Sequence, residues 1–260
     1  MKLRFLGTGT STGVPALLCD CPVCRSTDPR DRRTRTSALL TTPSGANLLI
    51  DCGPDFRQQA LAASSPRIDA LIVTHHHYDH VGGIDDLRPY CHHRHPDDGN
   101  LPVYGHAEVV ADIHRRLPYC FGDNLYPGVP TFDLRQIKPG EAFEVAGVRV
   151  LPLAVTHGPA TICGFRTGNL GYVTDCSALP EESREALRGT DTLVINALRH
   201  KPHPSHMNLE QALAVIRDIK PRQARLIHMS HDIGKHALTD ATLPTGVSLA
   251  FDGLEIEIPD

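Results

Sequence analysis

A cluster of histidines and an aspartate directly after a short apolar run most constrains how this chain can fold. The run Ala70–Val73 has the composition of a buried strand, and His75, His77, Asp79 and His80 follow it closely. His75 and His77 are two residues apart, so their side chains point to the same side where the chain is extended. Asp79 and His80 fall where the strand must turn, and two glycines then permit a tight bend. Because imidazole and carboxylate groups bind first-row metals, we predict a loop that offers four ligands to two adjacent metal ions.

Short β-prone runs alternate with amphipathic segments along the chain, and no repeat or linker divides it. We predict strands at Lys2–Leu6, Ser37–Thr41, Asn47–Asp51, Ala70–Thr74, Val148–Val155, Leu170–Thr174, Thr192–Ala197, Ala224–His228 and Leu254–Ile258. We predict helices at Asp55–Ala63, Ala107–Leu117, Pro180–Arg188 and Leu209–Ile219. Such alternation is typical of a layered α/β fold. We therefore expect one domain over residues 1–260, with an insertion around 91–140 that contains one helix and shapes the substrate entrance.

Three further ligand candidates, His157, Asp175 and His228, each stand where a predicted strand ends. In α/β folds, sites collect at the carboxyl ends of strands, because loops converge there while the sheet stays rigid. Asp175 taken alone would equally suit a cap for the helix after Ser177. Together with the four-ligand loop, the three residues indicate one shared metal centre.

Cys19, Cys21 and Cys24 place three thiols within six residues. Thiolates packed this closely repel one another unless a soft cation binds them, and a tetrahedral zinc needs a fourth ligand. Without a secretion signal, clustered cysteines favour metal binding over disulfides. The residues alone leave the fourth ligand open among Cys52, Cys91, Cys120, Cys163, Cys176 and a histidine.

The composition is that of an ordinary globular chain, with 40% hydrophobic residues, no Trp and a net charge of −4. The acidic balance argues against a large nucleic-acid surface, and the scarcity of aromatic residues argues against a base-stacking platform. The apolar stretches are far shorter than a membrane span, and the polar N-terminus does not resemble a signal peptide. We expect a cytoplasmic protein without membrane or nucleic-acid partners.

The order His-x-His-x-Asp-His at positions 75 to 80 resembles the signature of the metallo-β-lactamase superfamily. The resemblance implies an αβ/βα four-layer sandwich of two mixed β-sheets flanked by helices. It implies one metal on His75, His77 and His157, a second on Asp79, His80 and His228, and Asp175 as a bridge. Asp51, in an Asp-Cys-Gly segment, resembles the aspartate that supports this site from behind.

Within the superfamily, Gly7-Thr-Gly followed by the cysteine cluster resembles the phosphoribosyl 1,2-cyclic phosphate phosphodiesterases of phosphonate degradation. This resemblance implies a structural zinc on Cys19, Cys21, Cys24 and His231. It also implies that His206, 22 residues before His228, is a general acid or phosphate stabiliser, with Asp79 as the other catalytic residue. The family that works in pyrroloquinoline quinone biosynthesis has a similar cysteine cluster.

These features predict a hydrolase with two divalent cations, Zn or Mn, in the active site and one structural Zn. Two such cations can hold a hydroxide at neutral pH for attack on phosphorus. The expected substrate is a cyclic or small phosphodiester, or a nucleotide-like molecule. Alternatives are a ribonuclease Z-like nuclease, a lactone or thioester hydrolase, and a non-catalytic metal-holding scaffold, and a homodimer is an open option. The basic stretch Arg199, His200, Lys201 and His203 either orients a second phosphate or is simply solvated.

Overall fold

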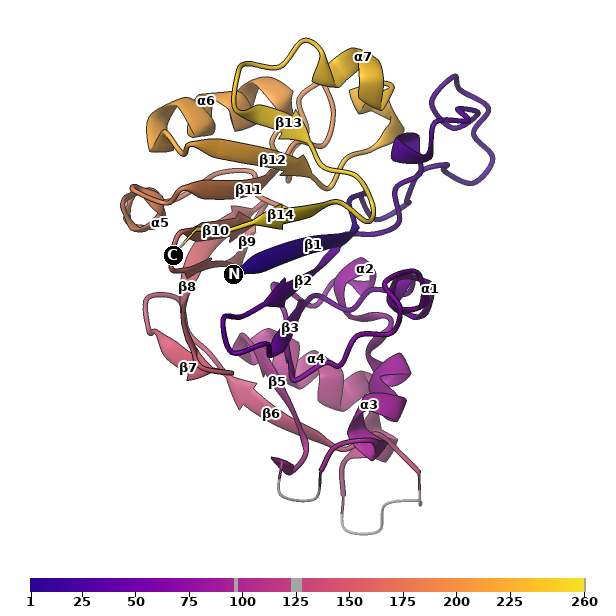
Figure 1. Cartoon of the computed structure of the whole chain (residues 1–260), viewed down its shortest axis with the longest axis vertical. Coiled ribbons are helices and arrows are strands. Elements are labelled where there is room, and N and C mark those ends of the chain that lie inside the picture. The colour runs from indigo at the N-terminus through magenta and orange to yellow at the C-terminus, as the bar shows by residue number, and fades with distance from the viewer. Residues whose placement is uncertain (96–97, 123–127, 260) are drawn as a thin grey trace.

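Two β-sheets packed face to face form the centre of the molecule (Figure 1), of which a computed structural model describes residues 1–95, 98–122 and 128–259. In the first sheet the strand order is β14 (Glu255–Glu257), β1 (Lys2–Gly7), β2 (Ser37–Thr41), β3 (Asn47–Ile50), β4 (Ala70–Ile72), β5 (Leu101–Gly105) and β6 (Phe132–Gln136). In the second it is β13 (Val247–Leu249), β12 (Gln223–Ile227), β11 (Thr192–Asn196), β10 (Leu170–Val173), β9 (Ala160–Thr167), β8 (Val148–His157) and β7 (Phe143–Val145). Both sheets contain parallel and antiparallel pairs, so both are mixed.

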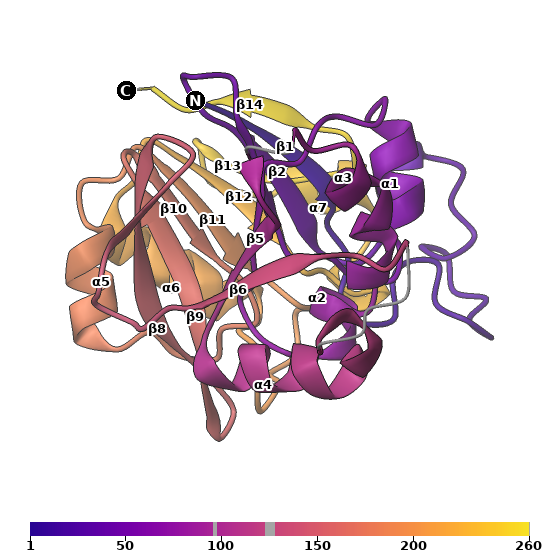
Figure 2. The ribbon, with the colours of Figure 1, turned by 90° about the horizontal axis from the view of Figure 1, so that it is seen from below.

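Helices cover the outer face of each sheet, as the views along two directions agree (Figures 1 and 2). Those on the first sheet are α1 (Phe56–Ala62), α2 (Tyr78–Val81), α3 (Arg88–His92) and α4 (Ala107–Arg116). Those on the second are α5 (Glu181–Leu187), α6 (Leu209–Ile219) and α7 (His236–Asp240). None of the described helices is long and apolar enough to cross a membrane. The expected αβ/βα sandwich of two mixed sheets is confirmed.

Both faces of the central strands are buried, which explains why these strands are almost continuously apolar. Successive side chains on a strand point to opposite faces. Leu40 of β2 and Val194 of β11 therefore lie in the core between the sheets. Their neighbours Leu39 and Ile195 pack instead against the helices outside.

The helix α6 has the bounds predicted from sequence. The Asn208 side chain accepts a hydrogen bond from the backbone N–H of Gln211, and the Gln211 side chain bonds back to the Asn208 backbone. This capping box satisfies donors that a helix start otherwise leaves unpaired. At the other end Lys220 adopts a left-handed conformation, with φ 56°, directly before Pro221. The helix start thereby fixes where the preceding turn, residues 199 to 207, meets the sheet.

The segment from 91 to 140 differs from the expected insertion with one helix. It contains α4, but it also supplies β5 and β6, which pair in parallel with each other and extend the first sheet beyond β4. β5 escapes sequence inspection because Pro102 and Gly105 interrupt its apolar pattern, and β6 escapes it because Phe132 and Leu134 are its only apolar residues. Residues 96–97 and 123–127 of the segment lie outside the described residues. That residues 1–260 form a single domain stays a prediction.

Candidate metal centre

The seven ligand candidates gather at one edge of the sandwich, where strands from both sheets end. Ligand atoms of His75, His77 and His157 lie within 4.8 Å of one another, and so do those of Asp79, His80, Asp175 and His228. The seven residues come from four chain segments that are far apart in sequence: residues 75–80, His157, Asp175 and His228. Six of the seven side chains are buried, and His77 is the exposed one. The two groups correspond to the two predicted cation positions.

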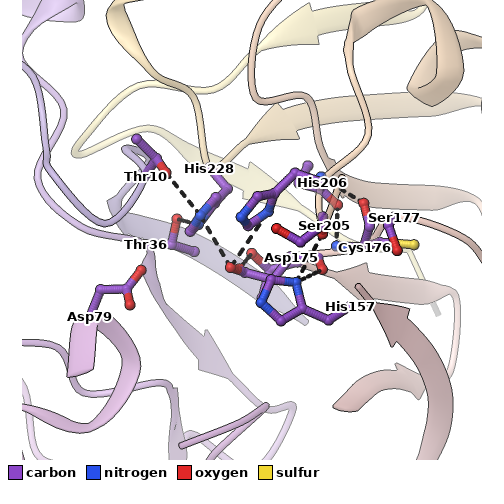
Figure 3. Close-up of polar contacts among 12 residues, drawn as sticks. Thr10, Thr36, Asp79, His157, Asp175, Cys176, Ser177, Ser205, His206 and His228 are labelled. Atoms are coloured by element: carbon purple, nitrogen blue, oxygen red, sulfur yellow. Dashed lines mark hydrogen bonds and ion pairs between the residues drawn. The ribbon is translucent and has the colours of Figure 1, made fainter. Parts of the chain in front are cut away.

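Asp175 lies between the two groups. Its carboxylate oxygens are 3.9 Å from His75 Nε2, 3.3 Å from His80 Nε2 and 3.2 Å from His228 Nε2. Figure 3 shows the carboxylate between the rings of His157, His206 and His228. This position suits a carboxylate that bridges two cations, and it does not suit the alternative of a helix cap, because α5 begins only at Glu181.

His80 is held in the orientation that a metal ligand needs. Its Nδ1 is 2.7 Å from Asp51 Oδ2, a carboxylate oxygen that can only accept a hydrogen bond when ionised. Nδ1 therefore carries a proton, and Nε2 is the nitrogen left for a metal. Burial lowers the pKa of His80, but Asp175 and Asp51 outweigh it and hold that pKa well above its usual value, so a cation at Nε2 has to displace a proton. That Nε2 is buried without any hydrogen-bond partner among the described residues. A cation would satisfy it.

His75 has the same arrangement through Thr74. The Thr74 hydroxyl donates to Asp51 at 2.8 Å, so it accepts from His75 Nδ1, 3.1 Å away. His75 Nε2 is then the unprotonated nitrogen, and it too is buried without a partner among the described residues. Asp51 thus orients two ligands at once, as expected of the aspartate behind the site.

Two more histidines follow the same rule. The Thr36 hydroxyl donates to the Gly9 carbonyl at 2.8 Å and so accepts from His228 Nδ1 at 3.0 Å. His157 Nδ1 is 2.7 Å from the Asp175 carbonyl and 2.9 Å from the Ser205 carbonyl, which are both acceptors. Each ring therefore has its lone pair on Nε2, and in His228 the Thr10 hydroxyl lies 3.1 Å from that nitrogen. A donor set of five imidazoles with two carboxylates fits two divalent cations.

Three residues of the site are forced into a left-handed backbone conformation. Asp51, Asp175 and His228 have φ of 60°, 54° and 55°, which is uncommon for residues other than glycine. Asp51 directly follows β3, His228 directly follows β12, and Asp175 lies two residues after β10. Such strain costs of the order of 1–3 kcal/mol per residue and tends to occur at functional sites. Here it turns each strand end toward the shared centre.

Burial and mutual charge shift the pKa values of the cluster. Burial alone would raise the pKa of Asp175, but His228 and His80 outweigh it and hold that pKa well below its usual range. Burial also lowers the pKa of His75, and the nearby His80 adds to this effect. The carboxylate stays charged and the imidazole neutral, as metal binding requires.

His206 lies against this cluster. Its Nδ1 is 3.7 Å from Asp175 Oδ2, and its ring stacks on His228 with centroids 5.0 Å apart (Figure 3). Burial, together with His228, lowers the pKa of His206 to about 3. A neutral imidazole at this position favours the role of phosphate stabiliser over that of a resting general acid.

The three clustered thiols meet one histidine of the loop after β12. The sulfur atoms of Cys19 and Cys24 are each 3.3 Å from His231 Nδ1, and Cys21 lies in the same group. Burial and the neighbouring thiols raise the pKa of Cys24 to about 11, so a second thiolate is unfavourable without a cation. Tetrahedral zinc coordination by three thiolates and an imidazole fits this donor set. Within the described residues, no other cysteine joins the group.

The four residues of the basic stretch after β11 do not act together: among the described residues, two of them contact backbone carbonyls and two do not. The Arg199 guanidinium donates to the carbonyls of Lys201 and Pro202, and His200 Nε2 contacts the Ile233 carbonyl at 3.1 Å. Arg199 and His200 therefore stabilise the local backbone through its carbonyls. Lys201 is exposed, and His203 is half-buried next to His206.

Two local features differ from the sequence expectation. Asp79 and His80 lie on a single helical turn, α2, rather than in an open loop. Gly83 serves close packing rather than a tight bend, because a Cβ there would lie 2.0 Å from the Gly53 carbonyl oxygen. Sequence inspection also missed Thr36 and Thr74. Nothing marks a threonine as a histidine's hydrogen-bond partner, although Thr74 directly precedes the histidine cluster.

Comparisons with known proteins agree with this geometry. The profile of the β-lactamase superfamily domain matches residues 46–229. An octanoyltransferase from Porphyromonas gingivalis is 45% identical over 261 residues, which are 100% of this chain and 52% of that protein. The chain therefore spans about half the length of this curated relative. A coenzyme PQQ synthesis protein B from Rhodopseudomonas palustris is 32% identical over 316 residues, covering 99% of this chain and 100% of that protein.

Among solved structures, a diphosphatase of the PhnP family is 39% identical, with a TM-score of 0.91 over 98% of this chain and 96% of that one. The chain thus belongs to the metallo-β-lactamase superfamily, where it is PhnP-like, and it has a His/Asp site suited to divalent metal ions.

Proposed function

We propose that this chain hydrolyses a cyclic or small phosphodiester, of the phosphoribosyl cyclic phosphate kind, at a centre of two divalent cations. The observation that carries the proposal is the position of Asp175 between the two ligand groups, with His206 against its carboxylate at 3.7 Å. The cations, when bound, would activate water and neutralise charge on the phosphoryl group. We further propose Zn or Mn in both positions.

The chain's own residues would then orient the substrate. Asp51, Thr36 and Thr74 hold the ligand histidines in the required form, and Asp79, 3.2 Å from His80 Nε2, completes the second cation position. His206, neutral in the free site, would donate a hydrogen bond to the phosphate. Once a negatively charged phosphate binds, the imidazole gains affinity for a proton and can pass it to the leaving oxygen.

The test compares substrates on the purified, metal-loaded protein. We expect turnover of a phosphoribosyl cyclic phosphate, weaker turnover of a linear dinucleotide, and none of a pre-tRNA or a lactone. His206→Ala should lower kcat on the cyclic phosphate about 10²- to 10⁴-fold without loss of the metals. Metal analysis should give three ions per chain, one of them zinc.

The matched control is His93→Ala, which changes an exposed histidine just after α3. Unchanged turnover by His206→Ala would refute the role of His206. Cleavage of pre-tRNA without turnover of the small diester would instead support the ribonuclease Z-like alternative, and turnover of the lactone alone would support the lactonase. A fully metal-loaded protein that hydrolyses none of the four would favour a scaffold.

A further inference from the structure

Thr10 belongs to the Gly7-Thr-Gly-Thr segment at the end of β1, to which the proposed function gives no task. Its hydroxyl oxygen lies 3.1 Å from His228 Nε2, and that nitrogen is 3.2 Å from the Asp175 carboxylate. Figure 3 shows the Thr10 hydroxyl directed at the His228 ring. Only 6% of Thr10 is exposed. Among the described residues, His228 Nε2 is the only hydrogen-bond partner of this hydroxyl.

The backbone ties Thr10 to the loop after β12. The Thr10 N–H donates to the Met229 carbonyl at 3.2 Å, and the Met229 N–H donates to the Thr8 carbonyl at 3.0 Å. A side chain at Gly9 is excluded, because its Cβ would lie 2.5 Å from the Arg33 carbonyl oxygen. The hydroxyl is thus held beside the metal centre before any ligand arrives, which lowers the ordering entropy lost on binding.

The direction of the hydrogen bond between Thr10 and His228 follows from the other ring nitrogen. His228 Nδ1 carries a proton, because it donates to the Thr36 hydroxyl at 3.0 Å. In the neutral ring Nε2 then has a lone pair and no proton, so the Thr10 hydroxyl is the donor. A cation bound to His228 would take this same lone pair. Thr10 and the cation therefore compete for one nitrogen.

A cation at His228 Nε2 would leave the Thr10 hydroxyl without its acceptor. A buried donor without an acceptor is unfavourable, and a hydrogen bond to a charged group is stronger than one between neutral groups. The substrate of the proposed function brings negatively charged phosphoryl oxygens to this centre. A phosphoryl oxygen is thus the acceptor that best suits the released hydroxyl.

We propose that Thr10 is a substrate-binding residue whose hydroxyl changes partner when the centre takes up its cations. While His228 Nε2 is free, the hydroxyl donates to it. Once a cation binds that nitrogen, the hydroxyl donates to a phosphoryl oxygen of the substrate. This inference rests on the proposed phosphodiesterase function and adds a residue that couples cation binding to substrate binding. The role of Thr10 is then opposite to that of Thr36, which supports His228 as a ligand.

The first experiment measures the affinity of the active site for Mn²⁺, a cation that does not suit the thiolates of the cysteine cluster. We expect Thr10→Val, which keeps the side-chain shape and removes the hydroxyl, to bind Mn²⁺ about 2- to 10-fold more tightly than wild type, because no hydrogen bond must be broken first. Weaker binding of Mn²⁺ by Thr10→Val would overturn the competition, since Thr10 would then support His228 as Thr36 does.

The second experiment measures phosphate binding and turnover in the Mn²⁺-loaded protein. Thr10→Val should raise the Kd of orthophosphate about tenfold. It should lower kcat/KM on the phosphoribosyl cyclic phosphate about 10- to 100-fold. Cation affinity and phosphate affinity should therefore change in opposite directions. A variant that is merely misfolded would lose both.

Two further variants are the controls. Thr10→Ser keeps the hydroxyl, so its Mn²⁺ affinity, orthophosphate Kd and kcat/KM should stay close to those of wild type. Thr12→Val makes the same change at an exposed residue of the same segment and should leave all three values unchanged. A loss of phosphate affinity in Thr12→Val equal to that in Thr10→Val would overturn the assignment to Thr10.

Failures of the two proposals can be told apart. If wild type hydrolyses the cyclic phosphate and Thr10→Val keeps both the orthophosphate Kd and kcat/KM, Thr10 does not bind substrate and the phosphodiesterase proposal stands. A loaded wild type that binds orthophosphate but hydrolyses no phosphodiester would overturn the proposed function. The orthophosphate Kd of Thr10→Val would still decide whether the hydroxyl contacts a phosphate. A loaded wild type that does neither would overturn both proposals.

Discussion

The His/Asp centre and the cysteine cluster are both candidate metal sites, but the chain builds them in opposite ways. The centre collects seven side chains, six of them buried, from distant strand ends, and neighbouring carboxylates, hydroxyls and carbonyls accept hydrogen bonds from four of its five histidines. The cysteine cluster takes three ligands from six consecutive residues in a loop that extends away from the sheets (Figure 1). Its thiols are only half-buried and contact one another and His231.

The two sites therefore obtain their geometry from different sources. The centre is preformed by the fold, and its cations would add charge and chemistry. The cysteine loop has few contacts of its own, so a cation would supply much of what holds it to the loop after β12.

The largest effect should follow Asp175→Asn, which removes the charge between the two ligand groups. Because the bridging charge contributes several kcal/mol to cation binding and transition-state stabilisation, kcat should fall about 10³-fold. Turnover of the phosphodiester and active-site metal content check this. Full activity with complete metal loading would show that Asp175 is no bridge.

Thr36→Val should have an intermediate effect. It removes the hydroxyl that accepts from His228 Nδ1 at 3.0 Å, so the tautomer of that ligand is no longer fixed. Loss of such a supporting partner typically costs 10- to 100-fold in metal affinity or activity, and we expect about tenfold. Titration with a competing chelator measures the affinity, and Thr36→Ser, which keeps the hydroxyl, is the matched control.

Cys24→Ser should affect stability more than turnover. If the loop depends on its cation, the variant loses one zinc per chain and the stability that binding supplies, about 2.7 kcal/mol for a cation at 100 times its Kd. Turnover should fall less than tenfold. Zinc content, thermal unfolding and kcat are the measurements. A variant that keeps its thermal stability after losing the zinc would argue that the loop is preformed as well.

The smallest effect on turnover is expected from Asp252→Asn, at a half-buried carboxylate that accepts hydrogen bonds from Thr8 and Thr34. Burial raises the pKa of Asp252 from 3.8 to about 6. Between these values the folded state binds the proton and the unfolded state releases it. The contribution of this group to stability is therefore present at low pH and is lost as the pH rises toward 6.

The variant has no such group, so its stability should fall less than that of wild type between about pH 4 and 6, with turnover unchanged. Unfolding by denaturant at several pH values gives this slope. Parallel slopes for the two proteins would mean that Asp252 has an ordinary pKa in the folded state.

Much of the fold and the site could be predicted because both depend on local patterns. The strand at Ala70 and the ligands that follow it are contiguous, and the bounds of α6 follow from its capping residues and Pro221. The ends of β8, β10 and β12 could be located from their apolar runs, so His157, Asp175 and His228 could be chosen. In each case the signal lies within about ten residues of sequence.

Other features of the protein depend on contacts between residues that are far apart in sequence, and these could be seen only in the tertiary structure. By itself the sequence determined the ligand types, the main strands and the presence of three neighbouring thiols. Only the fold determined that β5 and β6 extend the first sheet and that Thr36 and Gly9 set the tautomer of His228. Only the fold placed the ring of His203 beside that of His206. The physical reason is that hydrogen-bond direction and the position of a proton depend on atoms that sequence distance does not bring together.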